Sequence, residues 1–194
     1  DKVFCAVHLG KRQVEALRSK DRKHNFNRLS FAQRKYRQRF GDIKKRFKVK
    51  IDIKKFCKKL VGNNELIKIN YYISPLNQET NPEQYLEQQK FFDGLRKINN
   101  LNIILGRLEK RKRDGEIYYV EKASDVNLAL DLVLDAQKDI YDESYLISND
   151  GDFSGAVNSA INFGKKIIYI AIGNRKSISH YLKNVASRTF YITE

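Results

Sequence analysis

The chain has 194 residues, of which 41% are apolar and 11% aromatic, so it can bury the core of a globular domain and is not a disordered sequence. No apolar run approaches the roughly 20 residues of a membrane-spanning helix, and no secretory signal is recognisable, so we expect a soluble, cytoplasmic protein with no membrane contact. Cys5 and Cys57 are far apart and form no C-x-x-C pair, which argues against a zinc site and favours a reducing compartment.

The formal net charge of +15 is concentrated in the first third of the chain. Residues 1–60 carry 21 Lys/Arg against 5 Asp/Glu, a net charge of +16, whereas residues 61–194 carry 17 against 18. A basic segment beside a nearly neutral domain is typical of a protein that binds a polyanion, with nucleic acid the first candidate and an anionic membrane surface the second. A solvated basic face or an arm that docks on another protein would give the same pattern.

We divide the chain into a basic N-terminal segment, residues 1–47, and an α/β domain, residues 48–194. The segment opens with an apolar run at residues 3–8 that could form a strand, and one or two helices are expected after it. Aromatic rings interleaved with cations suit single-stranded nucleic acid, because bases stack on rings while cations track phosphates, although rings that pack helices onto the domain would explain the pattern as well. The cations that we assign to nucleic-acid binding are Lys11, Arg12, Arg34, Arg37, Lys44, Lys45 and Arg46.

The rest of the chain alternates between helix and strand patterns. The expected elements are a helix over 51–61, a strand over 66–74, a helix from 82 to about 98, a strand over 101–108, a hairpin through a basic turn at 111–115 into 116–120, a helix from 124, a strand over 145–147, a helix over 153–163, a strand over 166–172, a helix over about 177–185 and a strand over 189–192. Such alternation predicts a three-layer α/β sandwich with a mostly parallel central sheet.

The helix that begins near residue 124 is expected to be capped by Ser124. Its apolar spacing predicts that Val126, Leu130 and Leu134 are among the residues that face the core. The acids further along this helix, Asp131 among them, are then expected to face solvent.

Three aspartates are candidates for one site. Asp125 lies in the first turn of its helix, and Asp150 and Asp152 follow the next strand. In a βαβ unit a crossover helix starts at the edge where the strands end, so these carboxylates can meet. Crowded carboxylates repel one another unless a divalent cation neutralises them, and Mg²⁺ or Mn²⁺ suits oxygen ligands. Each acid could instead serve only as a turn or helix cap.

Residues 121–131 read E-K-A-S-D-V-N-L-A-L-D, and residues 146–153 read L-I-S-N-D-G-D-F. The two segments resemble the E-K-G-x-D-V-x-L-A-x-D and S-G-D-G-D-F blocks of NYN domains, the LabA-like branch of the PIN-like ribonucleases. The resemblance covers about residues 50–194 and implies a PIN-like fold with an acidic site for Mg²⁺ or Mn²⁺. It implies that the catalytic and metal-binding residues are Asp125, Asp150 and Asp152, with Asp131 and Asn149 as further candidates.

Members of that family open with a strand that ends in F-I-D-G-x-N, whose aspartate is a principal metal ligand. This chain has no such motif, and His8 lies where that aspartate would be. We therefore expect a metal-dependent ribonuclease that hydrolyses the phosphodiesters of RNA, and the rings and cations of the basic segment favour single-stranded RNA. A catalytically degenerate module that binds RNA or acts as a scaffold is the alternative, and a homo-oligomer or a protein partner stays open.

Overall fold

The structure is a computed structural model, and it describes residues 1–8, 52–80, 82–113, 116–172 and 178–192. The strands are β1 (Lys2–Val7), β2 (Glu65–Ile73), β3 (Leu101–Leu105), β4 (Arg107–Arg113), β5 (Glu116–Lys122), β6 (Glu143–Ile147), β7 (Lys166–Ile172) and β8 (Arg188–Ile192). The helices are α3 (Ile53–Val61), α4 (Pro82–Arg96), α5 (Ser124–Gln137), the 3₁₀ turn η1 (Gly151–Phe153), α6 (Ser154–Asn162) and α7 (His180–Val185). Within these ranges, no helix combines the length and apolar character that crossing a membrane requires.

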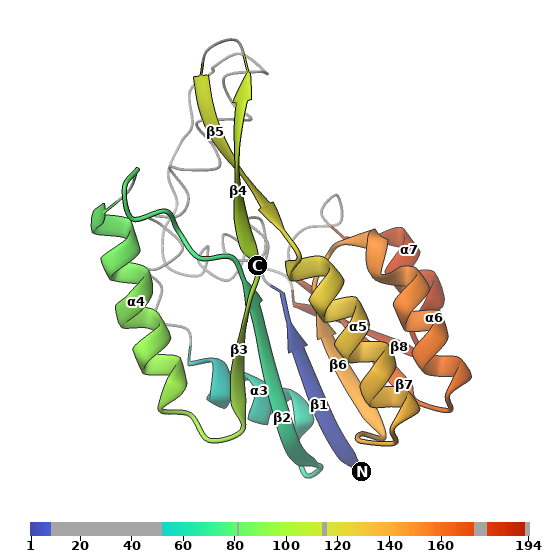
Figure 1. Cartoon of the computed structure of the whole chain (residues 1–194). Coiled ribbons are helices and arrows are strands. Elements are labelled where there is room, and N and C mark those ends of the chain that lie inside the picture. Colours follow the sequence, from blue (N-terminus) through green and yellow to red (C-terminus); the bar gives the residue numbers. More distant parts are fainter. Residues whose placement is uncertain (9–51, 81, 114–115, 173–177, 193–194) are drawn as a thin grey trace, which may run out of the picture.

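Six strands form one sheet in the order β3-β2-β1-β6-β7-β8, and every neighbouring pair in it is parallel. The order runs from β1 outward to β3 on one side and from β6 outward to β8 on the other (Figure 1). The direction in which successive strands are added to the sheet therefore reverses between β1 and β6. In open α/β sheets the carboxyl ends of the strands at such a switch point are where ligands bind.

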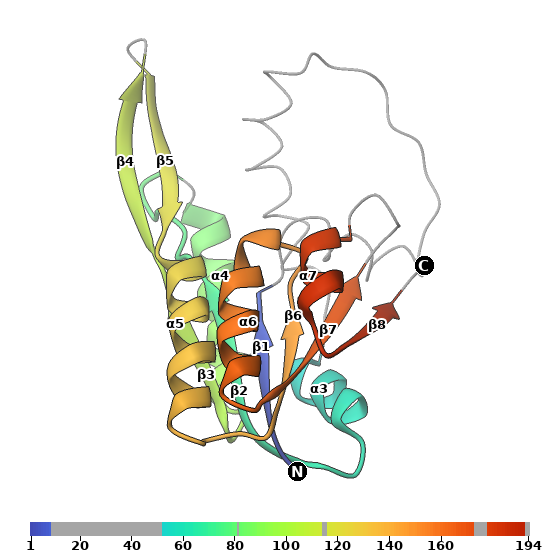
Figure 2. The same ribbon diagram turned by 90° about the vertical axis from the view of Figure 1, so that its right-hand side faces the viewer.

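Helices cover both faces of the sheet, because successive apolar side chains of β1 point to opposite faces and all of them are buried. Val3, Cys5 and Val7 pack in the layer of α3 and α4, whereas Phe4 and Ala6 pack in the layer of α5, α6 and α7. Figures 1 and 2 show the two helical layers on either side of the strands. The predicted three-layer α/β sandwich with a parallel central sheet is confirmed.

The strand expected within residues 3–8 is β1, and it lies in the middle of the sheet. Its residues 3–7 are fully buried, because both faces of a central parallel strand are covered. The central strand of the folded domain therefore comes from residues 1–47, which the sequence analysis assigned to a separate basic N-terminal segment. The helices expected after this strand lie outside the described residues, as do all seven cations assigned to nucleic-acid binding.

The strand expected over residues 101–108 is divided at Gly106 into β3 and β4. The Gly106 amide donates to the Ile73 carbonyl at 3.0 Å, which ends the pairing of β3 with β2. After Gly106 the chain leaves the sheet and forms the antiparallel hairpin β4–β5, which projects beyond the edge at which β1 ends (Figure 1).

The buried face of α5 differs from the predicted one. Val126, Leu130 and Leu134 are 60%, 52% and 42% exposed. The positions that face the sheet are Leu128, Leu132 and Ala136. Apolar residues occupy most of this helix, so periodicity alone could not select the inward face; the polar contacts of the acids on α5 with β2, described below, show which face it is.

Candidate functional site

The turn that follows β6 is built by its own polar side chains. Asp150 Oδ1 accepts a hydrogen bond from the Asp152 amide at 3.0 Å, and the Asp150 amide donates to Ser148 Oγ at 3.2 Å. Asp150 is thereby the cap of η1, with a half-buried side chain, while Asp152 is exposed. The capping role and a role in a site are compatible, since a carboxylate retains further lone pairs when one oxygen accepts a single amide.

Asn149 faces away from these aspartates and ties the turn to β7. Its Nδ2 donates to the Ile172 carbonyl at 2.7 Å, and its Oδ1 accepts from the Tyr169 hydroxyl at 2.9 Å. The same hydroxyl accepts from the Ser179 amide at 3.1 Å. Asn149 therefore holds the turn against β7 and the start of α7.

His8 and Asp125 meet at the carboxyl ends of β1 and β6. The His8 amide donates to the Ile147 carbonyl at 2.9 Å, which fixes His8 beside the turn after β6. The His8 Nε2 lies 3.4 Å from Asp125 Oδ1, and its ring packs edge-on against Phe153 with centroids 5.9 Å apart. This histidine thus occupies the switch point of the sheet, between the first turn of α5 and η1.

The acids of this edge act on one another electrostatically. Partial burial raises the pKa of Asp125 from its ordinary value, the charge of His8 lowers it, and the charges of Asp150, Glu121 and Asp152 raise it. The structure thus places the three aspartates that the sequence nominated at one edge of the sheet and within electrostatic reach of Asp125, although 25 residues separate Asp125 from Asp150. Carboxylates that repel one another in this way are held by the fold and not by mutual attraction.

The start of α5 differs from the sequence-based expectation. Its cap residue is Ala123, in the left-handed region with φ 76°, and no side chain caps the helix. Ser124 is buried and donates to Glu121 Oε1 at 2.6 Å. The predicted capping by Ser124 is wrong, because its hydroxyl serves instead to join the first turn of α5 to the end of β5.

Asp131 lies further along α5, against β2. Its Oδ2 accepts from Asn70 Nδ2 at 3.0 Å and from the Tyr72 hydroxyl at 2.8 Å. The burial of Tyr72 and the charge of Asp131 raise the pKa of Tyr72 well above its ordinary value. The structure gives Asp131 structural partners on β2, whereas Asp125 lies within electrostatic reach of Asp150 and Asp152.

The three aspartates fit Mg²⁺ or Mn²⁺ by donor type and by charge. Oxygen ligands suit both ions, and a divalent cation would offset the repulsion that raises the pKa of Asp125. Among the described residues, no three His, Cys, Asp or Glu side chains converge as a preformed metal group. The fit therefore rests on the chemistry of the donors.

Two members of this edge were not nominated as site residues from the sequence. The position of His8 was recognised, but its contact with Asp125 depends on the pairing of β1 with β6. Glu121 lies at the end of β5, four residues before Asp125, and its charge raises the pKa of that aspartate. Its place in the E-K-A-S-D segment was the signal that could have identified it.

These observations define a three-layer α/β domain with an acidic site at the switch point of a parallel sheet. The NYN domain family matches residues 27–193, so the chain belongs to this family, whose fold is of the PIN-like nuclease type. The match begins after β1 and therefore leaves out His8.

The same fold is present in a solved structure. All of this chain is covered by its similarity to the crystal structure of a protein of unknown function, VPA0982, from Vibrio parahaemolyticus RIMD 2210633, with a TM-score of 0.59. The two are 19% identical and the similarity covers 94% of that chain, which shows a common fold alone. No curated protein matches the chain.

Proposed function

We propose that the protein is a metal-dependent ribonuclease that hydrolyses RNA phosphodiesters at the carboxyl edge of its sheet. The observation that carries the proposal is that Asp125, Asp150 and Asp152 lie at one edge of the sheet, near enough for the charges of Asp150 and Asp152 to raise the pKa of Asp125. Membership of the NYN family supports it, because the fold is of the nuclease type. RNA is the substrate class that the excess of basic residues in the first 60 residues favours.

The three aspartates are the residues that would hold Mg²⁺ or Mn²⁺. Such an ion, when bound, supplies Lewis acidity that activates water and offsets the charge that develops on the phosphate. The chain itself supplies the arrangement: the turn after β6 fixes Asp150 and Asp152, and α5 presents Asp125 to them. His8, at 3.4 Å from Asp125, positions that carboxylate.

The substitution Asp150→Asn tests the proposal. Asparagine keeps an oxygen that can accept the Asp152 amide, so the turn survives while the charge is lost. Cleavage of single-stranded RNA in Mg²⁺ or Mn²⁺ should be abolished, and RNA binding should be unchanged or tighter because a negative charge is removed. Asp93→Asn is the matched control, since Asp93 is an exposed residue of α4 that pairs with Arg96. Cleavage by Asp150→Asn at the rate of this control would refute the assignment.

A second function is favoured by one observation. His8 stands where the family's first aspartate would be, which leaves the site with one carboxylate fewer and a nitrogen donor in its place. A site so altered would favour a domain that binds RNA or acts as a scaffold without cutting it. Wild-type protein that binds single-stranded RNA but does not cleave it in either ion would support this second function over the first.

We also propose that the protein works in a reducing compartment, the cytoplasm. Cys5 and Cys57 are both buried and free, and the hydrogen bonding of Cys5 with Cys57, together with its burial, raises the pKa of Cys5 well above the ordinary value. Free buried thiols are usual in proteins of reducing compartments. Fractionation of cells that express the protein, with a membrane-fraction control, checks this point.

A further inference from the structure

The hairpin β4–β5, residues 107–122, meets the site described above only at Glu121, near its end. We call it the basic arm, because five of the seven residues of β4 are Lys or Arg and one is Glu. It forms a separate two-stranded sheet and projects beyond the carboxyl edge of the main sheet (Figures 1 and 2). The domain around it is nearly neutral, so this concentration of cations is local.

The foot of the basic arm is fixed to the helix that carries Asp125. A Cβ at Gly106 would lie 2.4 Å from Ser124 Oγ and 2.6 Å from the Lys122 carbonyl oxygen. Real Cβ atoms do not approach so closely, so the glycine permits the two ends of the arm to pass beside the first turn of α5. The hydrogen bond from Ser124 to Glu121 joins the same two parts. The arm is thus held in a defined place relative to the candidate site.

Four cations of the arm are exposed and have no carboxylate partner among the described residues: Arg107, Lys110, Lys112 and Lys122. Arg111 differs from them, because it pairs with Glu109 at 3.1 Å. Arg107 and Lys122 lie directly opposite each other across the hairpin. Like charges at such a cross-strand position destabilise a hairpin, and an anion between them would relieve the repulsion.

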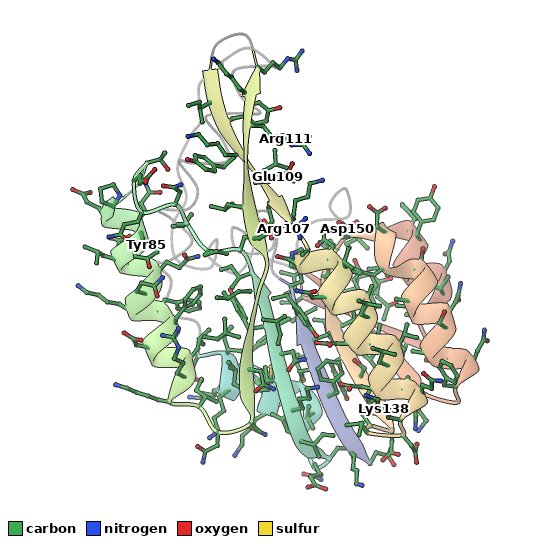
Figure 3. The ribbon with its side chains drawn as sticks, viewed as in Figure 1. Tyr85, Arg107, Glu109, Arg111, Lys138 and Asp150 are labelled. Carbon is green, nitrogen blue, oxygen red and sulfur yellow. The ribbon has the colours of Figure 1, made fainter. Side chains whose placement is uncertain are left out.

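The arrangement suits a nucleic-acid backbone with bases beside it. Figure 3 shows Arg107 at the foot of the arm, at the same edge of the molecule as Asp150. Further out on the same face as Arg107 and Lys122, Arg111 lies opposite Tyr118, which places a ring beside a cation. Rings that stack bases and cations that follow phosphates are the two parts of a single-strand binding surface. Ile117 is the large apolar side chain that the described part of the arm exposes, which is little apolar surface for insertion into a lipid bilayer.

We propose that the basic arm binds the phosphate backbone of single-stranded RNA and directs it to the aspartates at the foot of the arm. The proposal rests on the proposed ribonuclease function for the identity of the polymer. Arg107 and Lys122 hold the phosphates nearest the site, and Arg111, on the same face of the hairpin, extends the contact toward the tip.

The test compares two double variants of the full chain. Arg107→Gln with Lys122→Gln removes two charges from the foot of the arm. Lys97→Gln with Lys138→Gln removes two exposed charges at the amino edge of the sheet, where Figure 3 shows Lys138. Binding of a fluorescent oligouridylate is measured by anisotropy in EDTA over a range of salt concentrations, and circular dichroism verifies that both variants fold.

The arm variant should bind roughly tenfold more weakly than the control, and its slope of log affinity against log salt should be shallower by about 1.4, since each phosphate contact on a single strand contributes about 0.7. Arg107→Lys with Lys122→Arg keeps both charges and should bind as wild type does. Equal affinity and equal slope in the arm and control variants would overturn the proposal. A loss of binding to phosphatidylserine vesicles without a loss of RNA affinity would also overturn it, in favour of a membrane surface.

Cleavage of the same oligonucleotide by wild-type protein in Mn²⁺ separates this proposal from the proposed function. If the wild-type protein does not cleave and the Arg107→Gln/Lys122→Gln variant loses affinity, the proposal that the basic arm binds RNA is supported and the proposed ribonuclease function is refuted. If the wild-type protein cleaves and the Arg107→Gln/Lys122→Gln variant binds RNA like the control, only the proposal that the basic arm binds RNA is refuted.

Discussion

Helix α5 carries acids in two different environments. At its first turn, Asp125 lies within electrostatic reach of Asp150 and Asp152 and its side chain is 59% exposed, while partial burial and the charges of those acids raise its pKa. Two turns further along, Asp131 accepts hydrogen bonds from Asn70 and Tyr72, and Asp135 pairs with Lys68 at 2.7 Å. One helix therefore carries at its start an acid that the fold sets among other acids, and beyond it acids that hold the helix to β2.

The difference separates structural acids from candidate functional ones. An acid with a buried hydrogen-bond donor or a lysine contributes to folding, because removing it leaves that partner unsatisfied. An acid set among other acids costs stability and is retained for what it binds. On this criterion the carboxyl edge of the sheet is the candidate site, and the rest of α5 is the support that positions Asp125.

The largest effect is expected on cleavage. Asp125→Asn should reduce the rate of RNA cleavage by more than about a hundredfold, because even partners one step removed from a metal cost 10–100-fold. Asp135→Asn makes the same chemical change on the same helix and should leave cleavage per folded molecule unchanged. Rates are measured on a labelled oligonucleotide in Mn²⁺, and equal losses in the two variants would remove the distinction between the two ends of α5.

The second effect is on stability, and it is expected for the acids that contact β2 and not for the acid at the start of α5. Asp131→Ala should lower the free energy of unfolding by about 1–3 kcal/mol, because the buried Tyr72 hydroxyl loses its acceptor. Urea unfolding measures this quantity. Asp93→Ala, at an exposed position on α4, is the control and should change it by less than about 0.5 kcal/mol. An Asp131→Ala protein as stable as this control would show that the contact with β2 contributes nothing.

The smallest effect is a stabilisation. The pKa of Asp125 is higher in the folded than in the unfolded chain, so ionising this group costs stability as the pH rises through the folded-state value. Asp125→Asn should therefore raise the Tm slightly at neutral pH in EDTA, and the difference should disappear below the unfolded-state pKa of about 3.9. The rise is small because solvent screens a side chain that is 59% exposed. Calorimetry at several pH values measures it, and a lower Tm at neutral pH would contradict the repulsion.

The sequence predicted the sheet well because its strands are compact apolar runs. β7 occupies residues 166–172, the range that its run of β-branched and aromatic residues predicted. The central position of β1 was not predicted, since pairing of residues 3–7 with β2 and β6 is a long-range property. The inward face of α5 was predicted wrongly, because nearly every position from 126 to 136 is apolar or small except the acids and Asn127.

The acids were the most predictable part of the site. In a parallel sheet, the end of one strand and the start of the next helix share an edge, so the spacing of Asp125 and Asp150 was informative. The contact of His8 with Asp125 and the anchoring of the basic arm at Gly106 were not predictable, because both depend on packing between segments far apart in sequence. The sequence indicated a basic turn at residues 111–115 but not that the hairpin leaves the sheet.

Manganese binding tests the central claim, that the carboxyl edge of the sheet is a metal site, without depending on a choice of RNA. Electron paramagnetic resonance of Mn²⁺ distinguishes free from bound ion in the wild type, in Asp150→Asn and in the control Asp135→Asn. The account predicts that wild type and Asp135→Asn bind Mn²⁺ alike and that Asp150→Asn binds at least about tenfold more weakly. Wild-type protein that leaves Mn²⁺ free, or equal binding by Asp150→Asn, would contradict it.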